Sequence, residues 1–198
     1  MREPLHTLVA PCQYATQIRK SRFVAHAAPV ASAAQALDFL REVVTPSASH
    51  HCWAYRIGTD YRSNDDGEPG GSAGRPILLA IDGQGMDRVM VVVTRWFGGI
   101  KLGVGGLMRA YGGTAAECLR RGVRVPIVAM TRLHVHCEFA DAALLKARVA
   151  ELGASIESET GAADGMDLHL CVPTSRLADA QARIVAISRG RSVVKLLD

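Results

Sequence analysis

Residues 65–113 carry the strongest structural signal in the sequence, and they open with the loop Asp65-Asp66-Gly67-Glu68-Pro69-Gly70-Gly71-Ser72-Ala73-Gly74-Arg75-Pro76. An apolar segment follows, and a second glycine-rich loop then reads Gly98-Gly99-Ile100-Lys101-Leu102-Gly103-Val104-Gly105-Gly106. Glycine is favoured where the backbone takes a positive φ or approaches another group closely, and it destabilises the interior of a helix or strand. So many glycines beside charges predict a surface built from exposed backbone.

The apolar segment at residues 88–97 joins the two loops. Val89, Val91 and Val93 alternate with Met90 and Val92, so both faces of this segment are apolar. A strand of that kind is buried on both sides. After the second loop, apolar residues recur at helical spacing over residues 105–121, which predicts an amphipathic helix packed against the sheet.

The flanking parts of the first 125 residues show further elements. Residues 8–30 predict two extended segments, and Ser32 predicts the N-cap of a helix with apolar residues at helical spacing. The short apolar runs at residues 50–57 and 76–81 are interpreted as strands. We therefore expect an α+β domain at residues 1–125.

The pattern changes after residues 123–130, which we interpret as a linker around Pro126. Residues 132–139 and 166–172 alternate cleanly between apolar and polar, which predicts strands with one buried face and one face in water. Two amphipathic helices and two shorter strands complete the order βαββαβ, the ferredoxin-like arrangement. The expected second domain is residues 126–198.

Composition sets broad limits on the class of protein. The chain has 198 residues, 48% hydrophobic and 21% charged, as in a globular protein rather than a disordered one. Its net charge of +4 is uneven, because residues 1–125 hold 15 Lys/Arg against 10 Asp/Glu and residues 126–198 hold 8 against 9. Any attraction to polyanions belongs to the first part. The five cysteines are scattered and show no metal-binding spacing.

Targeting signals are also missing from the sequence. No apolar run is long enough to span a bilayer, and the N-terminus lacks the apolar core of a signal peptide. We therefore expect a cytoplasmic protein with no membrane segment. The sequence also shows no motif for sequence-specific DNA binding.

The two loops carry a resemblance to a known family. Residues 65–69, 73–76, 91–95, 98–103 and 105–112, together with the upstream runs Lys20-Ser21-Arg22-Phe23 and His51-Cys52-Trp53-Ala54-Tyr55, resemble the IMPACT/YigZ family in order and spacing. The resemblance covers about the first 120 residues. It implies an N-terminal αβ domain of the type shared by a small-subunit ribosomal protein and GHMP kinases. It also implies a C-terminal domain similar to the fifth domain of elongation factor G.

The resemblance implies a role in translation. Eukaryotic members restrain a stress-activated translation-control kinase by binding its activator, and the ribosomal and elongation-factor domain types point the same way. We therefore expect a non-catalytic protein that acts in translational regulation, binds structured RNA, the ribosome or a translation-associated protein, and has no cofactor. The alternative is a Mg-dependent enzyme or binding protein for a phosphorylated small molecule.

The start of the helix at residues 103–106 is a candidate anion site. Free N–H groups and the helix dipole at such an N-terminus attract negative charge. The predicted phosphate, nucleic-acid or partner site comprises Arg75, Arg95, Lys101, Gly103, Gly105, Gly106, Arg109 and Arg120. The alternative is that the glycines allow close helix packing and the arginines are only solvated. The spacing matches neither a Walker A loop nor a Rossmann fingerprint.

The acidic loop is open to two interpretations. Asp65, Asp66 and Glu68 have the oxygen ligands that Mg²⁺ prefers. They are also typical of a turn, with one carboxylate paired to Arg75 or Arg95. We favour the turn and expect no metal.

Histidines give two weaker candidates. On a strand, His50 and Cys52 face one way and His51 the other, so the three do not converge on one ion. In the second part, His134, His136 and His169 share the polar face of neighbouring strands, where they are either solvated or able to bind a transition metal. An enclosed pocket uniting the two glycine-rich loops would favour an enzyme. An open groove lined by Arg75, Arg95 and Arg109 would favour a macromolecular partner.

Overall fold

A computed structural model describes residues 5–197 of the chain. The chain divides into two compact units, with the division between Ile127 and Val128, and each unit is described by itself. Sequence patterning placed this division between residues 125 and 126. Within the described residues, no helix is both long and apolar enough to cross a membrane.

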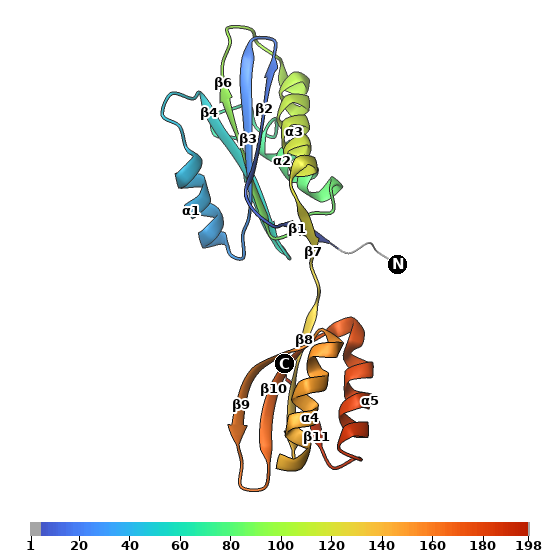
Figure 1. Cartoon of the computed structure of the whole chain (residues 1–198). Coiled ribbons are helices and arrows are strands. Elements are labelled where there is room, and N and C mark those ends of the chain that lie inside the picture. The colour runs from blue at the N-terminus through green and yellow to red at the C-terminus, as the bar shows by residue number, and fades with distance from the viewer. Residues whose placement is uncertain (1–4, 198) are drawn as a thin grey trace. The chain divides into compact units, whose positions relative to one another are not determined.

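The first unit is built on one antiparallel sheet in the strand order β2-β3-β6-β4-β5 (Figure 1). Its strands are β2 (Cys12–Ile18), β3 (Ser21–Pro29), β4 (His50–Ile57), β5 (Asp60–Asn64) and β6 (Val89–Trp96). The expected doubly buried strand is β6, and it lies at the centre of the sheet with Val89 to Arg95 all buried. Helices cover both faces, which is why both alternating sets of its side chains are apolar.

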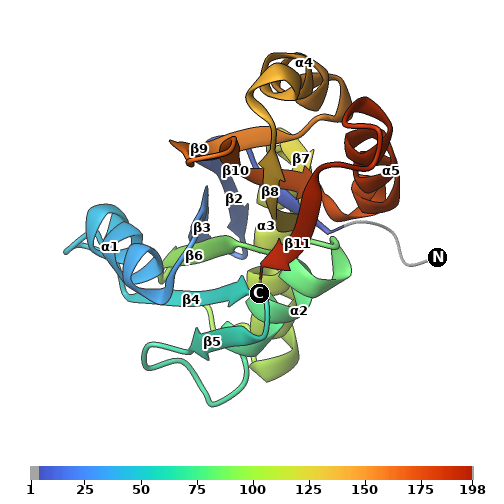
Figure 2. The ribbon, with the colours of Figure 1, turned by 90° about the horizontal axis from the view of Figure 1, so that it is seen from below.

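Helix α1 (Ala33–Val43) covers one face, and helices α2 (Gly74–Gly83) and α3 (Val104–Arg121) cover the other (Figure 1). Figure 2 shows α2 and α3 side by side, in agreement with their extensive contacts. Ser32 caps α1 as expected, because its side chain accepts a hydrogen bond from the N–H of Gln35. The larger core lies under α2 and α3 around Phe23, Ile77 and Tyr111.

The strand expected at residues 76–81 is wrong, because this segment is part of helix α2. A short apolar run does not by itself distinguish a buried strand from a buried helix. Pro76 fits here because it stands in the first turn, where its missing N–H has no partner to lose. Ile77 and Ile81, four residues apart, point into the core together.

Part of the segment interpreted as a linker is paired with the N-terminal end of the chain. Strand β7 (Arg124–Pro126) runs antiparallel to β1 (His6–Leu8), and together they form a small separate sheet. The alternation of only three residues was too short to predict this pairing. The first unit therefore extends to Ile127.

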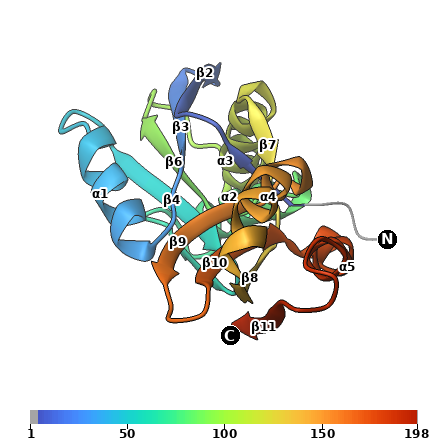
Figure 3. The ribbon, with the colours of Figure 1, turned by 60° about the horizontal axis from the view of Figure 1, so that its bottom comes forward.

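The second unit has the order βαββαβ, as the alternation predicted. It comprises β8 (Met130–Cys137), α4 (Phe139–Val149), the short turn η1 (Ala150–Leu152), β9 (Ser155–Gly161), β10 (Met166–Pro173), η2 (Thr174–Arg176), α5 (Leu177–Ile187) and β11 (Val193–Leu197). The sheet order is β11-β8-β10-β9, all antiparallel. Both helices lie on one face (Figure 3), where Leu133, Val135 and Leu168 form the core with Leu145 and Ile184.

Candidate binding site between the glycine-rich loops

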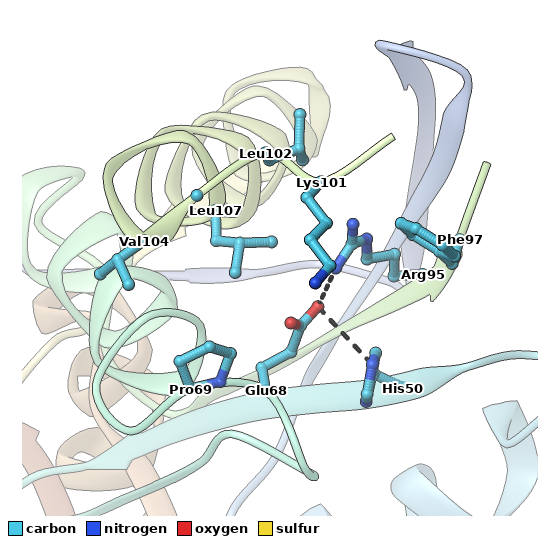
Figure 4. A pocket seen from close by; sticks show the side chains of 10 residues that line it. His50, Glu68, Pro69, Arg95, Phe97, Lys101, Leu102, Val104 and Leu107 are labelled. Carbon is cyan, nitrogen blue, oxygen red and sulfur yellow. Dashed lines mark hydrogen bonds and ion pairs between the residues drawn. The ribbon is translucent and has the colours of Figure 1, made fainter. Parts of the chain in front are cut away.

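The two glycine-rich loops meet at a cavity of about 410 Å³ in the first unit. The acidic loop contributes Glu68 and Pro69, and the second loop contributes residues 101–104 with Leu107 of α3 (Figure 4). The remaining walls come from the start of β4 and the end of β6. The lining residues are His50, Glu68, Pro69, Arg95, Phe97, Lys101, Leu102, Gly103, Val104 and Leu107.

A buried ion pair forms the floor of this cavity (Figure 4). Arg95 Nη1 donates a 2.6 Å hydrogen bond to Glu68 Oε1, and their side chains are only 5% and 4% exposed. The Tyr111 hydroxyl donates to the same oxygen at 2.7 Å. The Arg95 guanidinium carbon also lies 5.5 Å from the ring centre of Phe23 and 5.4 Å from that of Phe97. The charge of Arg95 is thus compensated inside the protein rather than offered at the surface.

Cys52 and Tyr111 lie beside this pair, and both hold their protons firmly. Burial, together with nearby carboxylates, raises the pKa of the Cys52 thiol to about 12. The thiol donates to the carbonyl of Asp65 at 3.0 Å. Burial is also the main cause that raises the pKa of Tyr111. Both groups therefore keep their protons at neutral pH and serve as hydrogen-bond donors, Cys52 to the carbonyl of Asp65 and Tyr111 to Glu68.

Asp65 organises the acidic loop from within. Its carboxylate accepts hydrogen bonds from the N–H groups of Gly71 (2.8 Å), Ala73 (2.9 Å) and Gly74 (2.8 Å). Burial acts to raise the pKa of this carboxyl, but the three backbone donors outweigh it and hold the pKa below its ordinary value. Asp65 therefore occupies the N-terminus of α2 with the protein's own negative charge.

Asp66 and Glu68 also have partners within the protein. Asp66 Oδ2 accepts from the N–H of His51 at 2.6 Å, and its carbonyl accepts from His50 Nδ1 at 2.7 Å. The His51 ring lies between Asp66 and Thr45, since its Nδ1 is 3.7 Å from Asp66 Oδ2 and its Nε2 accepts from the N–H of Thr45. Across residues 5–197, no group of three or more His, Cys, Asp or Glu side chains is arranged to hold a metal ion.

The N-terminus of α3 is arranged differently. Gly103 takes a φ of 71°, which glycine adopts without strain, and it gives no side-chain cap. Among the described residues, the N–H groups of Val104, Gly105 and Gly106 have no hydrogen-bond partner. Lys101, just before the helix, points into the cavity (Figure 4). The N-terminus of α2 is thus occupied by Asp65, whereas the N-terminus of α3 is open beside Lys101.

Two smaller depressions lie along α3, and each shares lining residues with a neighbouring depression. Leu102 also lines a second depression of about 260 Å³ with Ile18, Arg19, Gly106, Arg109 and Ala110. Ile18, Arg109 and Ala110 in turn line a third depression, of about 290 Å³, with Tyr14, Thr16, Gly113, Thr114, Glu117 and Arg120. We call these three neighbouring depressions, lined by the residues just given, the α3 groove. Residues of α3 line all three, and residues of the edge strand β2 line the two smaller ones.

The structure thus separates the predicted cations. Lys101, Arg109 and Arg120 lie along the α3 groove, although Arg120 also pairs with Glu117. Arg95 is buried in the cavity floor, and Arg75 is exposed on α2 and lines none of the three depressions. Sequence patterning missed Arg19, Phe97 and the β2 wall. The only sign in the sequence that Phe97 belongs to the site was its position as an aromatic residue directly before Gly98-Gly99.

The three histidines of the second unit lie together on neighbouring strands. His134 and His169 are paired across β8 and β10, with ring centres 5.3 Å apart. Asp167 Oδ1 lies 2.9 Å from His134 Nε2 and 3.0 Å from His136 Nδ1. Hydrogen bonds from His136 and His134 lower the pKa of Asp167. One carboxylate therefore orders two of the imidazoles.

The fold and the site define a two-part α+β protein, in which a helix-covered antiparallel sheet with two glycine-rich loops precedes a βαββαβ unit. Residues 19–119 match the family model described as the Impact N-terminal domain. IMPACT family member YigZ of Escherichia coli (strain K12) is 32% identical over 188 residues, which are 91% of this chain and 92% of that protein. The chain therefore belongs to the IMPACT family and is a homologue of YigZ.

Two further similarities agree with this assignment. An IMPACT family member of Thermus thermophilus, described as lying in the pol 5' region, is 58% identical over 111 residues. That match spans 56% of this chain and 62% of the Thermus protein. A solved structure described as that of an hypothetical protein has a TM-score of 0.75 and 30% identity, covering 100% of this chain and 99% of its own.

Proposed function

We propose that this chain is a non-catalytic RNA-binding protein of the translation machinery, which binds an unpaired RNA strand in the α3 groove. The observation that carries the proposal is the succession of depressions along α3. The three neighbouring depressions, with Arg19, Lys101, Arg109 and Arg120 in their linings, follow an 18-residue helix. Such a helix is about 27 Å long. A basic channel of this length suits the backbone of a linear polyanion better than a compact small molecule.

The cavity at one end of the groove suits a single nucleotide. Its walls at Leu102, Val104 and Leu107 are apolar, and Phe97 is 49% exposed there. Unpaired RNA bases stack on aromatic side chains, and a phosphate binds at a helix N-terminus with free N–H groups. The open start of α3 and Lys101 supply both a dipole and a charge for that phosphate.

We also propose a domain type for each of the two units. The strand order β11-β8-β10-β9 within a βαββαβ unit supports a ferredoxin-like second domain, similar to the fifth domain of elongation factor G. For the first unit we propose the αβ type shared with a ribosomal protein and GHMP kinases. Both types support a partner within the translation machinery, although a shared fold alone does not establish a shared function.

Fluorescence anisotropy of a labelled single-stranded RNA oligonucleotide tests the proposal. We expect saturable binding that Lys101→Ala and Arg109→Ala each weaken severalfold, with duplex RNA binding less tightly. Arg41→Ala is the matched control, because Arg41 is exposed on α1, away from the groove, and pairs with Asp38. Equal affinity of all three variants and the wild type would overturn the proposal.

One observation favours a second candidate, a binding protein for a phosphorylated small molecule. The cavity unites both glycine-rich loops in one site of about 410 Å³, a volume within the usual range for small ligands. The carboxylates of Asp65, Asp66 and Glu68 already have hydrogen-bond or ion-pair partners within the protein, which supports a phosphate-binding protein that holds its ligand without a metal. A thermal shift with nucleoside monophosphates, but no binding of longer RNA, would favour it over the RNA proposal.

A further inference from the structure

Two cysteines far apart in the sequence lie side by side in the first unit. The Sγ atoms of Cys12, at the start of β2, and Cys118, in the last turns of α3, are 3.8 Å apart. Cys12 is partly exposed on an edge strand, whereas Cys118 is buried. A disulfide needs a sulfur–sulfur distance of about 2 Å, so side-chain rotation has to bring the two atoms closer by roughly 1.8 Å.

The surroundings give the two sulfurs different properties. A hydrogen bond from Cys118 lowers the pKa of the Cys12 thiol to about 7, against the opposing effect of burial. The hydrogen bond to Cys12 and burial raise the pKa of Cys118. The carbonyl oxygen of Ala25 lies 3.6 Å from Cys118 Sγ and is within reach of the same thiol. An accessible thiolate beside a protonated thiol is the arrangement in which one sulfur reacts first and the other resolves the product.

We propose that Cys12 and Cys118 form an oxidisable dithiol, in which a hydroperoxide oxidises Cys12 and Cys118 then closes a disulfide. The Cys12 thiolate attacks one peroxide oxygen and the O–O bond breaks, so that Cys12 becomes a sulfenic acid. The other oxygen takes up the proton that Cys12 had released on ionisation and leaves as water or an alcohol. Cys118 sulfur then attacks Cys12 sulfur. The sulfenic hydroxyl leaves with the Cys118 proton as water, so two thiols are oxidised and one peroxide is reduced.

The other three cysteines do not offer this chemistry. Cys52 is buried in the first unit, with its thiol bonded to the carbonyl of Asp65 and its pKa raised by burial. Cys137 is buried in the second unit, and burial raises its pKa. Cys171 is partly exposed on β10 of the second unit, which makes it the comparison thiol for Cys12.

A disulfide at this position would join the two elements that line the α3 groove. Strand β2 contributes Tyr14, Thr16 and Ile18 to one wall, and α3 contributes Arg109 and Gly113 to the other. The proposal rests on the two cysteines and their surroundings and is independent of RNA binding.

Peptide mapping under non-reducing conditions tests the proposal on the wild-type chain. After brief treatment with an equimolar amount of hydrogen peroxide, we expect the Cys12 and Cys118 peptides to be linked, with a loss of two hydrogen masses that dithiothreitol reverses. A folded, treated protein in which both residues stay reduced would overturn the proposal, and so would a disulfide that maps to another pair.

A second measurement separates the roles of the two residues. Without oxidant, we expect iodoacetamide to alkylate Cys12 about tenfold faster than Cys171 at neutral pH. In Cys118→Ser we expect peroxide to leave a Cys12 sulfenic acid that dimedone traps, whereas Cys171→Ser still forms the disulfide. Alkylation of Cys12 no faster than that of Cys171 would contradict the assigned order of reaction.

Discussion

Arg95 and Glu68, which are 27 positions apart in the sequence, form an ion pair of 2.6 Å that joins the end of β6 to the acidic loop. Both side chains are buried, and the pair forms the floor of the cavity. Tyr111 of α3 donates to the same carboxylate oxygen. The central strand, one loop and one helix therefore converge on a single carboxylate.

Arg95→Met should be strongly destabilising, because it leaves the Glu68 charge buried without a partner. We expect the free energy of unfolding in urea to fall by about 3–5 kcal/mol, and the double variant Arg95→Met/Glu68→Leu to recover part of that loss. Arg183→Met is the control, since Arg183 pairs with Asp179 on an exposed surface where about 0–1 kcal/mol is expected. Equal losses for the two single variants would contradict this description of the pair.

Asp65→Asn should weaken the acidic loop in a pH-dependent way. The substitution replaces one side-chain oxygen by an amide NH₂ group, which cannot accept hydrogen bonds. At least one of the three backbone donors then loses its acceptor, and we expect the free energy of unfolding to fall by about 1–3 kcal/mol at pH 7. The lowered pKa of Asp65 means that its stabilisation is fully present above the pKa of the unfolded state, about 3.9, and is lost as the pH falls further.

The measurement is urea unfolding of wild type and Asp65→Asn at several pH values. The difference between them should be constant from pH 7 to about 5 and should shrink as the pH falls below about 4. A difference that grows toward acid would show that the Asp65 carboxylate does not cap the loop and α2.

Two glycine substitutions should have opposite effects on stability. A Cβ at Gly98 would lie 2.0 Å from the backbone oxygen of Lys20, so Gly98→Ala requires a backbone shift between the second loop and the turn that joins β2 to β3. Gly113 lies within α3 with nothing within 4 Å of its added Cβ, so Gly113→Ala should stabilise by up to about 1 kcal/mol. Thermal unfolding should show a lower midpoint for the first variant and a higher one for the second.

Phe97→Ala should weaken RNA binding more than it changes folding. The ring is half exposed at the cavity, and the loss of one base stacking contact is worth about 1–3 kcal/mol. Fluorescence anisotropy should therefore show a loss of affinity of roughly 5- to 150-fold. Tyr61→Ala is a matched control, because Tyr61 is similarly exposed on β5 and does not line the groove. Equal affinity of both variants and the wild type would exclude a base at Phe97.

Patterns within single elements were enough to predict much of the fold. The two apolar faces of β6, the amphipathic α3 and the alternation of β8 and β10 each follow from side chains a few residues apart. Helix α2 was mistaken for a strand, because its start depends on Asp65, which lies outside the apolar run. Strands β1 and β7 form because they pair with each other, and each is too short to show a pattern of its own.

The candidate site was predictable only in part for the same reason. The glycines and cations around Lys101 are close in sequence, so their proximity could be expected. The burial of Arg95 depends on Glu68 and Tyr111, which come from two other segments. The β2 wall depends on the pairing of β2 with β3, which leaves β2 at the edge of the sheet beside α3. Neither relationship is visible in a single stretch of residues.

The claim that the α3 groove binds the RNA backbone is tested most sharply by the salt dependence of RNA binding. Each phosphate contact on a single strand contributes about 0.7 to the slope of log Kobs against log salt concentration. We expect Lys101→Ala and Arg109→Ala each to reduce the wild-type slope by about that amount, with Arg41→Ala leaving it unchanged. Equal slopes for the wild type and all three variants would contradict the claim.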